Sequence, residues 1–282
     1  MTPAQDLAAA SAAAPNDAGR SAGALMVRVV LPAVVLAVVV GLWEGVVRLK
    51  HIPPYVLPSP LLVMSTLIDD WRVLFESLLV TLTTTLEGFV TAAIGGIGLA
   101  LLFSRSRLLE YSLFPYAVIL QVTPVIAIAP LLLIYLPQEV AVVVCAFIVA
   151  FFPVLSNTTL GLASVDRNLA GLFVLYGATP MQTLWHLRLP AALPYILGGL
   201  RIAGGLSLIG AVVAEIAAGS AGAGSGLAYR IAESSYRLNI PRMFAALVLL
   251  SAAGIVIYMA LSLVSHLVLR RWHESALGKD AG

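Results

Sequence analysis

Among the ionisable side chains inside long apolar segments of this sequence are Glu87, Arg201 and Glu215. If those segments cross a membrane, each such residue costs roughly 2.5–3.5 kcal/mol on insertion, which makes it a candidate functional residue. Arg201 and Glu215 are 14 positions apart. On one helix that separation is about 21 Å of rise, so the two side chains cannot pair with each other.

Each of the three residues has a structural interpretation beside a functional one. Arg201 lies about two turns inside its apolar segment, where its guanidinium either reaches back to the membrane surface or lines a translocation pathway. Glu215 lies towards the other end of the same segment, where gating, pathway lining and simple interfacial placement all fit. Glu87 is expected to be a packing or interfacial residue.

Gln121 lies in an apolar segment that Pro124 and Pro130 interrupt. A helix break at membrane depth is tolerated where the freed backbone groups meet protein or a water-filled cavity. These three residues are therefore further candidates for lining a pathway. Small residues spaced four apart predict close helix packing elsewhere, in Ala203-Ser207-Ala211 and Gly210-Ala214-Ala218.

The motifs of common enzyme sites are missing from the sequence. There is no G-x-x-x-x-G-K-[ST] phosphate loop, no H-E-x-x-H zinc motif and no G-x-S-x-G nucleophile motif. The four histidines are scattered without metal-ligand spacing. A net charge of +2 provides no basic surface for binding nucleic acid. We therefore expect no enzyme, no cofactor or metal, and no nucleic-acid partner.

The composition indicates that membrane lipid surrounds the chain. Of its 282 residues, 60% are hydrophobic and 11% are charged, and the mean hydropathy is +1.00; soluble domains are nearer half apolar and a quarter charged. Continuous apolar runs of about 20 residues or more favour helices over barrel strands. We predict an all-α polytopic fold of six membrane-spanning helices, in Val29–Val47, Ser77–Ser104, Tyr111–Gln138, Val140–Val165, Pro190–Tyr229 and Met243–Leu269.

The flanking charges predict the orientation. With both termini in the cytoplasm, nine basic residues flank the inner ends of the spans and six flank the outer ends, as the positive-inside rule favours. The protein is thus expected in the inner (plasma) membrane. We expect a disordered cytoplasmic tail over residues 1–25, a first span and outer interfacial connector over 26–75, a core over 76–273 with a cytoplasmic loop at 164–190, and a second tail over 274–282.

The loop at 164–190 contains the strongest local signals. Asp166 is placed to cap a first short helix, and Gly177 is placed to end it in a left-handed conformation. Thr179 with Gln182 forms a capping box for a second helix, in which proline takes the first position. Pro190 is expected to stop this second helix.

One face of the second helix predicts a contact surface. At i, i+3, i+4 and i+7 spacing it carries Met181, Leu184, Trp185 and Arg188. Such a face either docks a partner or packs against the protein's own helix ends.

Several motifs in order along residues 26–273 resemble the permeases of ABC importers, in the nitrate, sulfonate, taurine and bicarbonate subgroup. Gly177 followed by Leu187, Leu189 and Pro190 is similar to the G-x9-[IL]-x-L-P pattern of their cytoplasmic loop. Further similar segments are Leu57–Pro60, Pro190–Ile196, Gly199–Arg201, Val212–Glu215 and Arg271-Trp272. The family loop begins Glu-Ala-Ala, whereas this chain has Gly171-Leu172-Phe173.

The resemblance implies a type I ABC importer permease fold and a set of partners. These are two copies of a separate ATPase, an external (periplasmic) substrate-binding protein, and a second permease copy in a homodimer around one pathway. It implies that the ATPase couples through Gly177, Ala178, Thr179, Met181, Leu184, Trp185, Leu187, Leu189 and Pro190. The alternative is a secondary, ion-coupled transporter, which would use in-membrane carboxylates such as Glu215 and Glu87 and no ATPase.

Overall fold

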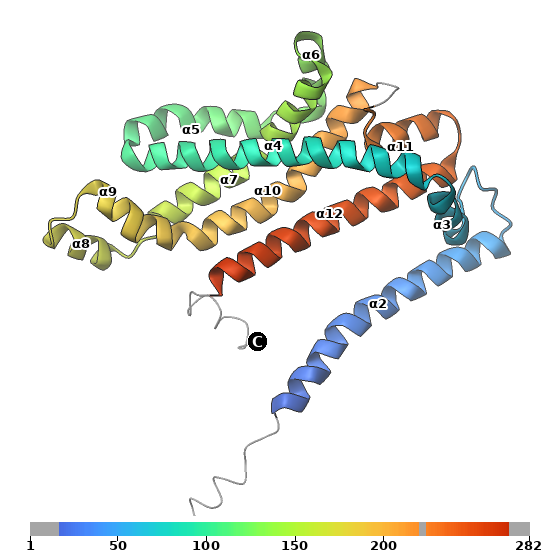
Figure 1. Cartoon of the computed structure of the whole chain (residues 1–282), viewed down its shortest axis with the longest axis horizontal. Helices are drawn as coiled ribbons and strands as arrows, with labels where there is room; N and C mark the ends of the chain where they lie inside the picture. The colour runs from blue at the N-terminus through green and yellow to red at the C-terminus, as the bar shows by residue number, and fades with distance from the viewer. Residues whose placement is uncertain (1–16, 220–223, 271–282) are drawn as a thin grey trace, which may run out of the picture. The chain divides into compact units, whose positions relative to one another are not determined.

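The structure, a computed structural model, describes residues 17–219 and 224–270. In chain order the helices are α2 (Asp17–Leu49), α3 (Pro60–Asp69), α4 (Trp71–Arg105), α5 (Arg107–Val122), α6 (Val125–Tyr135), α7 (Gln138–Ala163), α8 (Arg167–Leu175), α9 (Pro180–Thr183), the π-helix η1 (Leu184–Arg188), α10 (Leu189–Ala218), α11 (Leu227–Tyr236) and α12 (Ile240–Leu269). Figure 1 shows the course of the chain.

The length and composition of these helices confirm the predicted fold class. Within the described residues, 5 helices are long and apolar enough to cross a membrane, and α5 with α6 makes a sixth if the bent pair counts as one span. The predicted span over Tyr111–Gln138 is a broken one, because α5 and α6 meet at 99° on either side of Thr123 and Pro124. Thr123 is extended there, since Pro124 disfavours the α conformation of the residue before it.

Chain contacts divide the protein into two units, Met1–Val63 and Met64–Gly282. In the first unit, α2 begins at Asp17, so the last part of the expected tail over residues 1–25 is helical, as its alanine-rich sequence favours. Residues 1–16 and the second expected tail, 274–282, lie outside the described residues. Glu44 pairs with Arg48 and accepts a hydrogen bond from the backbone N–H of Leu61 at 3.2 Å.

The second unit is built on α4, α7 and α10, which approach one another at small residues. Ala146 of α7 lies between Gly88 of α4 and Gly210 of α10. A Cβ at Gly210 would lie 2.8 Å from the Ala146 Cα, and one at Gly88 would collide with the Ala146 Cβ. Ser207 is fully buried and donates a hydrogen bond to the Thr85 carbonyl at 2.8 Å. The small-residue stripe of α10 thus serves packing within the chain, as predicted.

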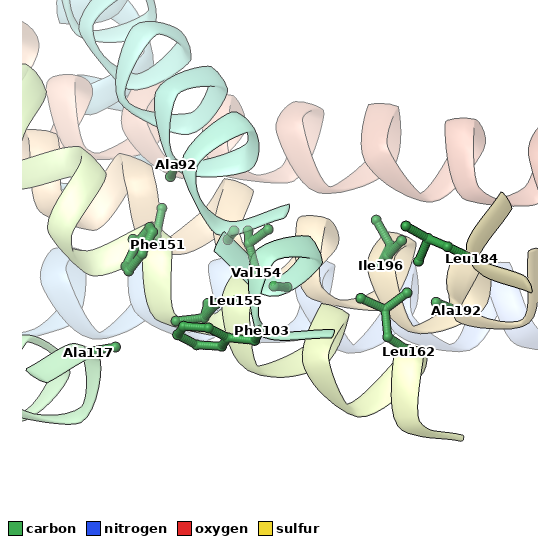
Figure 2. Packing of buried hydrophobic residues seen from close by; sticks show 13 residues of the cluster. Ala92, Phe103, Ala117, Phe151, Val154, Leu155, Leu162, Leu184, Ala192 and Ile196 are labelled. Atoms are coloured by element: carbon green, nitrogen blue, oxygen red, sulfur yellow. The ribbon is translucent and has the colours of Figure 1, made fainter. Parts of the chain in front are cut away.

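Larger side chains fill the core away from these contacts. Figure 2 shows Phe151, Val154 and Leu155 of α7 with Phe103 of α4. The same cluster continues to Ile196 of α10 and to the start of η1. The start of η1 is therefore connected to the core of the spans by direct packing.

Candidate functional site

The candidate coupling residues and Glu215 lie at two opposite ends of the second unit. In Figure 1, α8 and α9 lie at the end where α4 passes into α5, and α11 lies at the end where α4 begins. We call these the α8–α9 end and the α11 end. Gly177 belongs to the first, and Glu215 belongs to the second.

Gly177 forms the bend between α8 and α9 with a φ of +69°. The Gly177 N–H donates to the Val174 carbonyl at 3.0 Å, and the Ala178 N–H donates to the Phe173 carbonyl at 2.9 Å. This pair of bonds is a Schellman ending, which requires the left-handed backbone that glycine adopts without steric cost. At the start of α8, Asp166 accepts from the Asn168 N–H at 2.6 Å. Both predicted caps are confirmed.

The predicted capping box of α9 is also confirmed. The Thr179 N–H donates to Gln182 Oε1 at 2.7 Å, and the Gln182 N–H donates to Thr179 Oγ1 at 3.3 Å. Pro180 takes the first helical position. Two reciprocal bonds satisfy donors that the helix start would leave unpaired, so the direction of α9 is set by local contacts.

Apolar side chains around this bend are exposed. They form what we call the bend patch, whose exposed fractions run from 51% to 84%: Val174, Leu175, Tyr176, Met181 and Trp185. Trp185 Nε1 donates to the Met181 sulfur at 3.1 Å, which ties two members together. Contiguous exposed apolar side chains at a loop end are typical of an interaction surface.

Leu184 does not share the exposure of the other residues on its predicted face. It is 9% exposed and belongs to the core cluster, beside Ile196 in Figure 2. Leu189 also packs against that cluster. The π-turn over Leu184–Arg188 changes the angular spacing on which the sequence prediction relied. Of the predicted face, Met181 and Trp185 are exposed and Leu184 is a packing residue.

Pro190 does not stop the second loop helix, contrary to the sequence prediction. The chain runs on from α9 through η1 into α10, and Pro180–Ala218 is one helical segment of 39 residues. Proline inside an α-helix lacks the N–H and clashes with the carbonyl four residues earlier. The wider η1 turn, in which the Leu189 N–H donates to the Leu184 carbonyl, accommodates Pro190.

The break between α5 and α6 borders an open cavity of about 310 Å³. Gln121 and Pro124 line it together with Thr123, whose hydroxyl donates to the Ile119 carbonyl at 2.7 Å. The opposite wall comes from α7 and from Leu206 of α10. Backbone at a helix break therefore faces a hollow here, as the sequence suggested for Gln121 and Pro124.

The other two candidates from the central spans lie away from this cavity lining. Pro130 falls inside α6 and interrupts no helix. Arg201 is partly buried in α10, and within the part of the chain described its Nε has no hydrogen-bond partner. Neither residue lines the cavity at the α5–α6 break.

Glu215 holds together three helices at the α11 end. The Thr81 hydroxyl of α4 donates to Glu215 Oε2 at 2.9 Å, and the Ala228 N–H of α11 donates to the same oxygen at 3.1 Å. The Leu227 N–H in turn donates to the Thr81 hydroxyl at 2.8 Å. Glu215 is 5% exposed. The carboxylate therefore caps the start of α11, whose own cap residue, Gly226, has no side chain to do so.

Gly226 allows this arrangement because a Cβ there would overlap the Glu215 carboxylate. A small cavity of about 40 Å³ borders the same carboxylate, with Tyr229 and Thr84 in its lining. Thr81 was not among the predicted site residues, because nothing in the local sequence connects it with a residue 134 positions away. The presence of a threonine hydroxyl in an apolar segment was the feature of the sequence that could have indicated Thr81.

Glu87 is exposed on α4, one residue from the midpoint of that helix. Glu87 is therefore not packed in the interior of this unit, and its placement at an interface stays a prediction. Two threonine hydroxyls on the same exposed face, those of Thr83 and Thr91, bond to the carbonyls of Leu79 and Glu87. This face of a candidate membrane span carries a carboxylate that lipid tails cannot solvate.

Comparison with known proteins identifies the family. Residues 92–275 match the family described as binding-protein-dependent transport system inner membrane component. The chain belongs to this family of transport permeases. The permease is 32% identical to a probable ABC transporter permease protein of Haemophilus influenzae, over 86% of this chain and 98% of that one.

Two further relatives and one solved structure agree with this assignment. The permease is 34% identical to the formylaminopyrimidine transport permease protein ThiX of Halalkalibacterium halodurans (81% and 90% covered) and 30% identical to the putative aliphatic sulfonates transport permease protein SsuC of Bacillus subtilis (84% and 84%). The crystal structure of an amino acid ABC transporter with histidines shares the fold, with a TM-score of 0.57 at 20% identity over 73% of this chain and 96% of that chain.

Membership confirms several sequence predictions. The protein is the multi-pass inner-membrane component of a binding-protein-dependent ABC importer, a transport permease and not an enzyme. The family implies an ABC ATPase and a substrate-binding protein as partners. It does not favour the alternative of a secondary, ion-coupled transporter.

Proposed function

We propose that two copies of this permease enclose one translocation pathway, and that two copies of a separate ATPase drive it by binding the bend patch at the α8–α9 end. Both termini then lie in the cytoplasm, and an external binding protein delivers the substrate from the side of the α11 end. In this proposal residues 76–273 form the permease core and residues 164–190 the coupling loop.

The observation that carries the proposal is the continuous helix from Pro180 to Ala218. At 1.5 Å per residue its length is about 50–60 Å. Its first turns carry Met181 and Trp185 of the bend patch, and its last turn carries Glu215. A displacement of the bend patch by the ATPase therefore reaches the α11 end through one helix, without a flexible joint at Pro190.

The predicted coupling residues have different roles. Met181 and Trp185 provide exposed contact surface, and Gly177, Ala178 and Thr179 shape the bend that presents it. Leu184 and Leu189 anchor the segment in the core, while Leu187 belongs to η1 and Pro190 to the first turn of α10. The family's Glu-Ala-Ala is replaced by Gly171-Leu172-Phe173, so we propose apolar contacts in place of an acidic one.

The exposed carboxylate of Glu87 supports the pairing of two permeases. A charged group near the centre of a span is costly against lipid and is found facing a bundle interior or a water-filled cavity. The exposed face of α4 therefore turns towards a second copy or the pathway between the copies. Gln121 and Pro124, which line the cavity at the α5–α6 break, are further pathway residues in this proposal. Glu215 holds α4, α10 and α11 together at the outer side of the pathway.

Substrate choice in this proposal belongs mainly to the binding protein. Two of the relatives named above are a permease for a formylaminopyrimidine and a putative permease for aliphatic sulfonates, solutes that differ in charge and shape. Their sequences match this chain to similar degrees. A shared permease framework thus serves chemically different solutes.

A pair of tryptophan variants tests the coupling surface. Trp185→Ala removes an exposed aromatic side chain of the bend patch, and Trp71→Ala removes one of similar exposure at the opposite end. We expect Trp185→Ala to reach the membrane normally and to retain at least tenfold less ATPase on purification, as for a truncated hot spot of about 2 kcal/mol. Trp71→Ala should retain the ATPase. Full retention by Trp185→Ala would refute the assignment of the bend patch.

A further inference from the structure

A cleft of about 400 Å³ opens at the α8–α9 end and belongs to none of the surfaces described above. Its walls come from the end of α4, the start of α5, the end of α7, the start of α8 and the end of η1. The charged residues of its lining are three arginines, Arg107, Arg167 and Arg188, and one carboxylate, that of Glu110. A fourth arginine, Arg105, lines the adjoining cavity, which shares Arg188.

None of these four guanidinium groups forms an ion pair or hydrogen bond within the part of the chain that the structure describes. Elsewhere in the second unit, by contrast, arginines pair with carboxylates: Arg230 lies 3.0 Å from Glu233, and Arg242 lies 3.2 Å from Asp70. The carboxyl of Glu110, the acidic group of the cleft lining, is also without an ion pair among the described residues. The cleft thus carries a net positive charge, because its three arginines outnumber its one carboxylate.

A hydroxyl donor completes the lining. Thr159 Oγ1 is buried at the cleft wall and has no hydrogen-bond partner among the described residues. Ser104, also in the wall, donates its own proton to the Leu101 carbonyl at 2.7 Å. A buried unsatisfied hydroxyl costs free energy unless a ligand or water completes it. Guanidinium forks together with a hydroxyl donor are suited to phosphate oxygens.

The position of the cleft indicates where such a phosphate comes from. The candidate spans Trp71–Arg105 and Gln138–Ala163 both end at its walls, so the cleft lies at the level of the lipid headgroups. Basic pockets between membrane helices at this depth bind anionic headgroups. We propose that this cleft is a binding site for a phosphate-bearing anion, supplied by an anionic lipid headgroup or by free phosphate. The proposal does not depend on how the ATPase docks.

Binding by the purified full-length permease, measured by native mass spectrometry, tests the site. The probes are phosphatidylglycerol, zwitterionic phosphatidylcholine and inorganic phosphate. We expect the double variant Arg107→Gln/Arg167→Gln to bind phosphatidylglycerol about twenty- to thirtyfold more weakly than the parent, about fivefold for each charge. Both side chains are exposed, so folding should be unaffected. The matched control is Arg72→Gln/Arg237→Gln, two exposed arginines at the α11 end, which should bind as the parent does.

A variant that should strengthen anion binding distinguishes a binding role of the cleft residues from a structural one. Glu110→Gln removes the carboxylate of the cleft lining, so phosphatidylglycerol should bind about fivefold more tightly. Thr159→Val keeps the side-chain volume and removes the hydroxyl, so binding should weaken. A structural role for these residues would not predict an increase with the first and a decrease with the second.

The three probes distinguish the sources of the anion. Tight phosphatidylglycerol binding with weak inorganic phosphate binding supports a lipid headgroup; equal binding of both, lost in the arginine double variant, supports free phosphate. Phosphatidylglycerol binding that is unchanged in the arginine double variant and in Glu110→Gln overturns the proposal. So does loss of ATPase from the double variant without any change in anion binding, which would assign the arginines to acidic side chains of the ATPase.

Discussion

The Thr81 hydroxyl and the Glu215 carboxylate meet at 2.9 Å across 134 positions of sequence, where α4 and α10 hold the first residues of α11. Thr81 accepts from the Leu227 N–H while it donates to Glu215. Two backbone donors of α11 are thus satisfied by side chains from two other helices. Any opening of the protein at the α11 end must break or move this connection.

Removal of the Glu215 side chain should destabilise the permease. Glu215→Ala leaves the buried Ala228 N–H without its acceptor, and we expect the free energy of unfolding to fall by at least about 2 kcal/mol. Glu215→Gln keeps an acceptor oxygen and removes a buried charge, so stability, membrane abundance and uptake should stay near parental. Thermal unfolding in detergent and transport by membrane vesicles measure these effects. Lost uptake by a stable Glu215→Gln would show that the charge itself takes part in transport.

Two glycines of α10 should respond oppositely to alanine. Gly210→Ala places a Cβ 2.8 Å from the Ala146 Cα, so α7 and α10 must separate; we expect a loss of about 1–3 kcal/mol. At Gly205 the added Cβ would have no atom within 4 Å beyond its chain neighbours and the local backbone of α10 itself. Gly205→Ala should be neutral or stabilise the helix by up to about 1 kcal/mol. Equal melting temperatures for the two variants would contradict the packing described here.

Substitution of Gly177 should uncouple the permease from its ATPase without preventing membrane insertion. Gly177→Val forces a β-branched residue to a φ of +69°, which is strained, so α9 and the bend patch should be displaced. The control is Gly98→Val, which lies in α4, outside the coupling loop, with open space around the added Cβ. Co-purification and uptake should be lost in the first variant and kept in the second. Retention of a stoichiometric ATPase by Gly177→Val would show that the bend is not part of the coupling element.

Cysteine labelling should establish the orientation. The sole cysteine, Cys145, is buried and is replaced by alanine in the parent for this test. Tyr236 at the α11 end is 90% exposed and Leu175 at the α8–α9 end is 84% exposed. An impermeant thiol reagent added to intact cells should label Tyr236→Cys at once, and Leu175→Cys after the membrane is permeabilised. The reverse pattern would invert the proposed topology and the ATPase contact with it.

Local features of this protein follow from residues close together in sequence. The caps of Asp166 and Thr179, the left-handed bend at Gly177 and the apolar spans depend on bonds over a few positions or on composition, and the structure confirms them. The resemblance in the loop likewise anticipated the family. These features need no knowledge of which helices touch.

Other features were decided by contacts between helices, or by backbone geometry that sequence rules do not predict. The burial of Leu184 depends on packing beside α10 and α7, and the passage of the helix through Pro190 depends on a π-turn that no helical-spacing rule anticipates. The role of Glu215 depends on Thr81, and the charge of the basic cleft depends on arginines from separate helices. Periodicity assigns a side chain to a face of its own helix, but only the neighbouring helices decide whether that face meets protein, lipid or water.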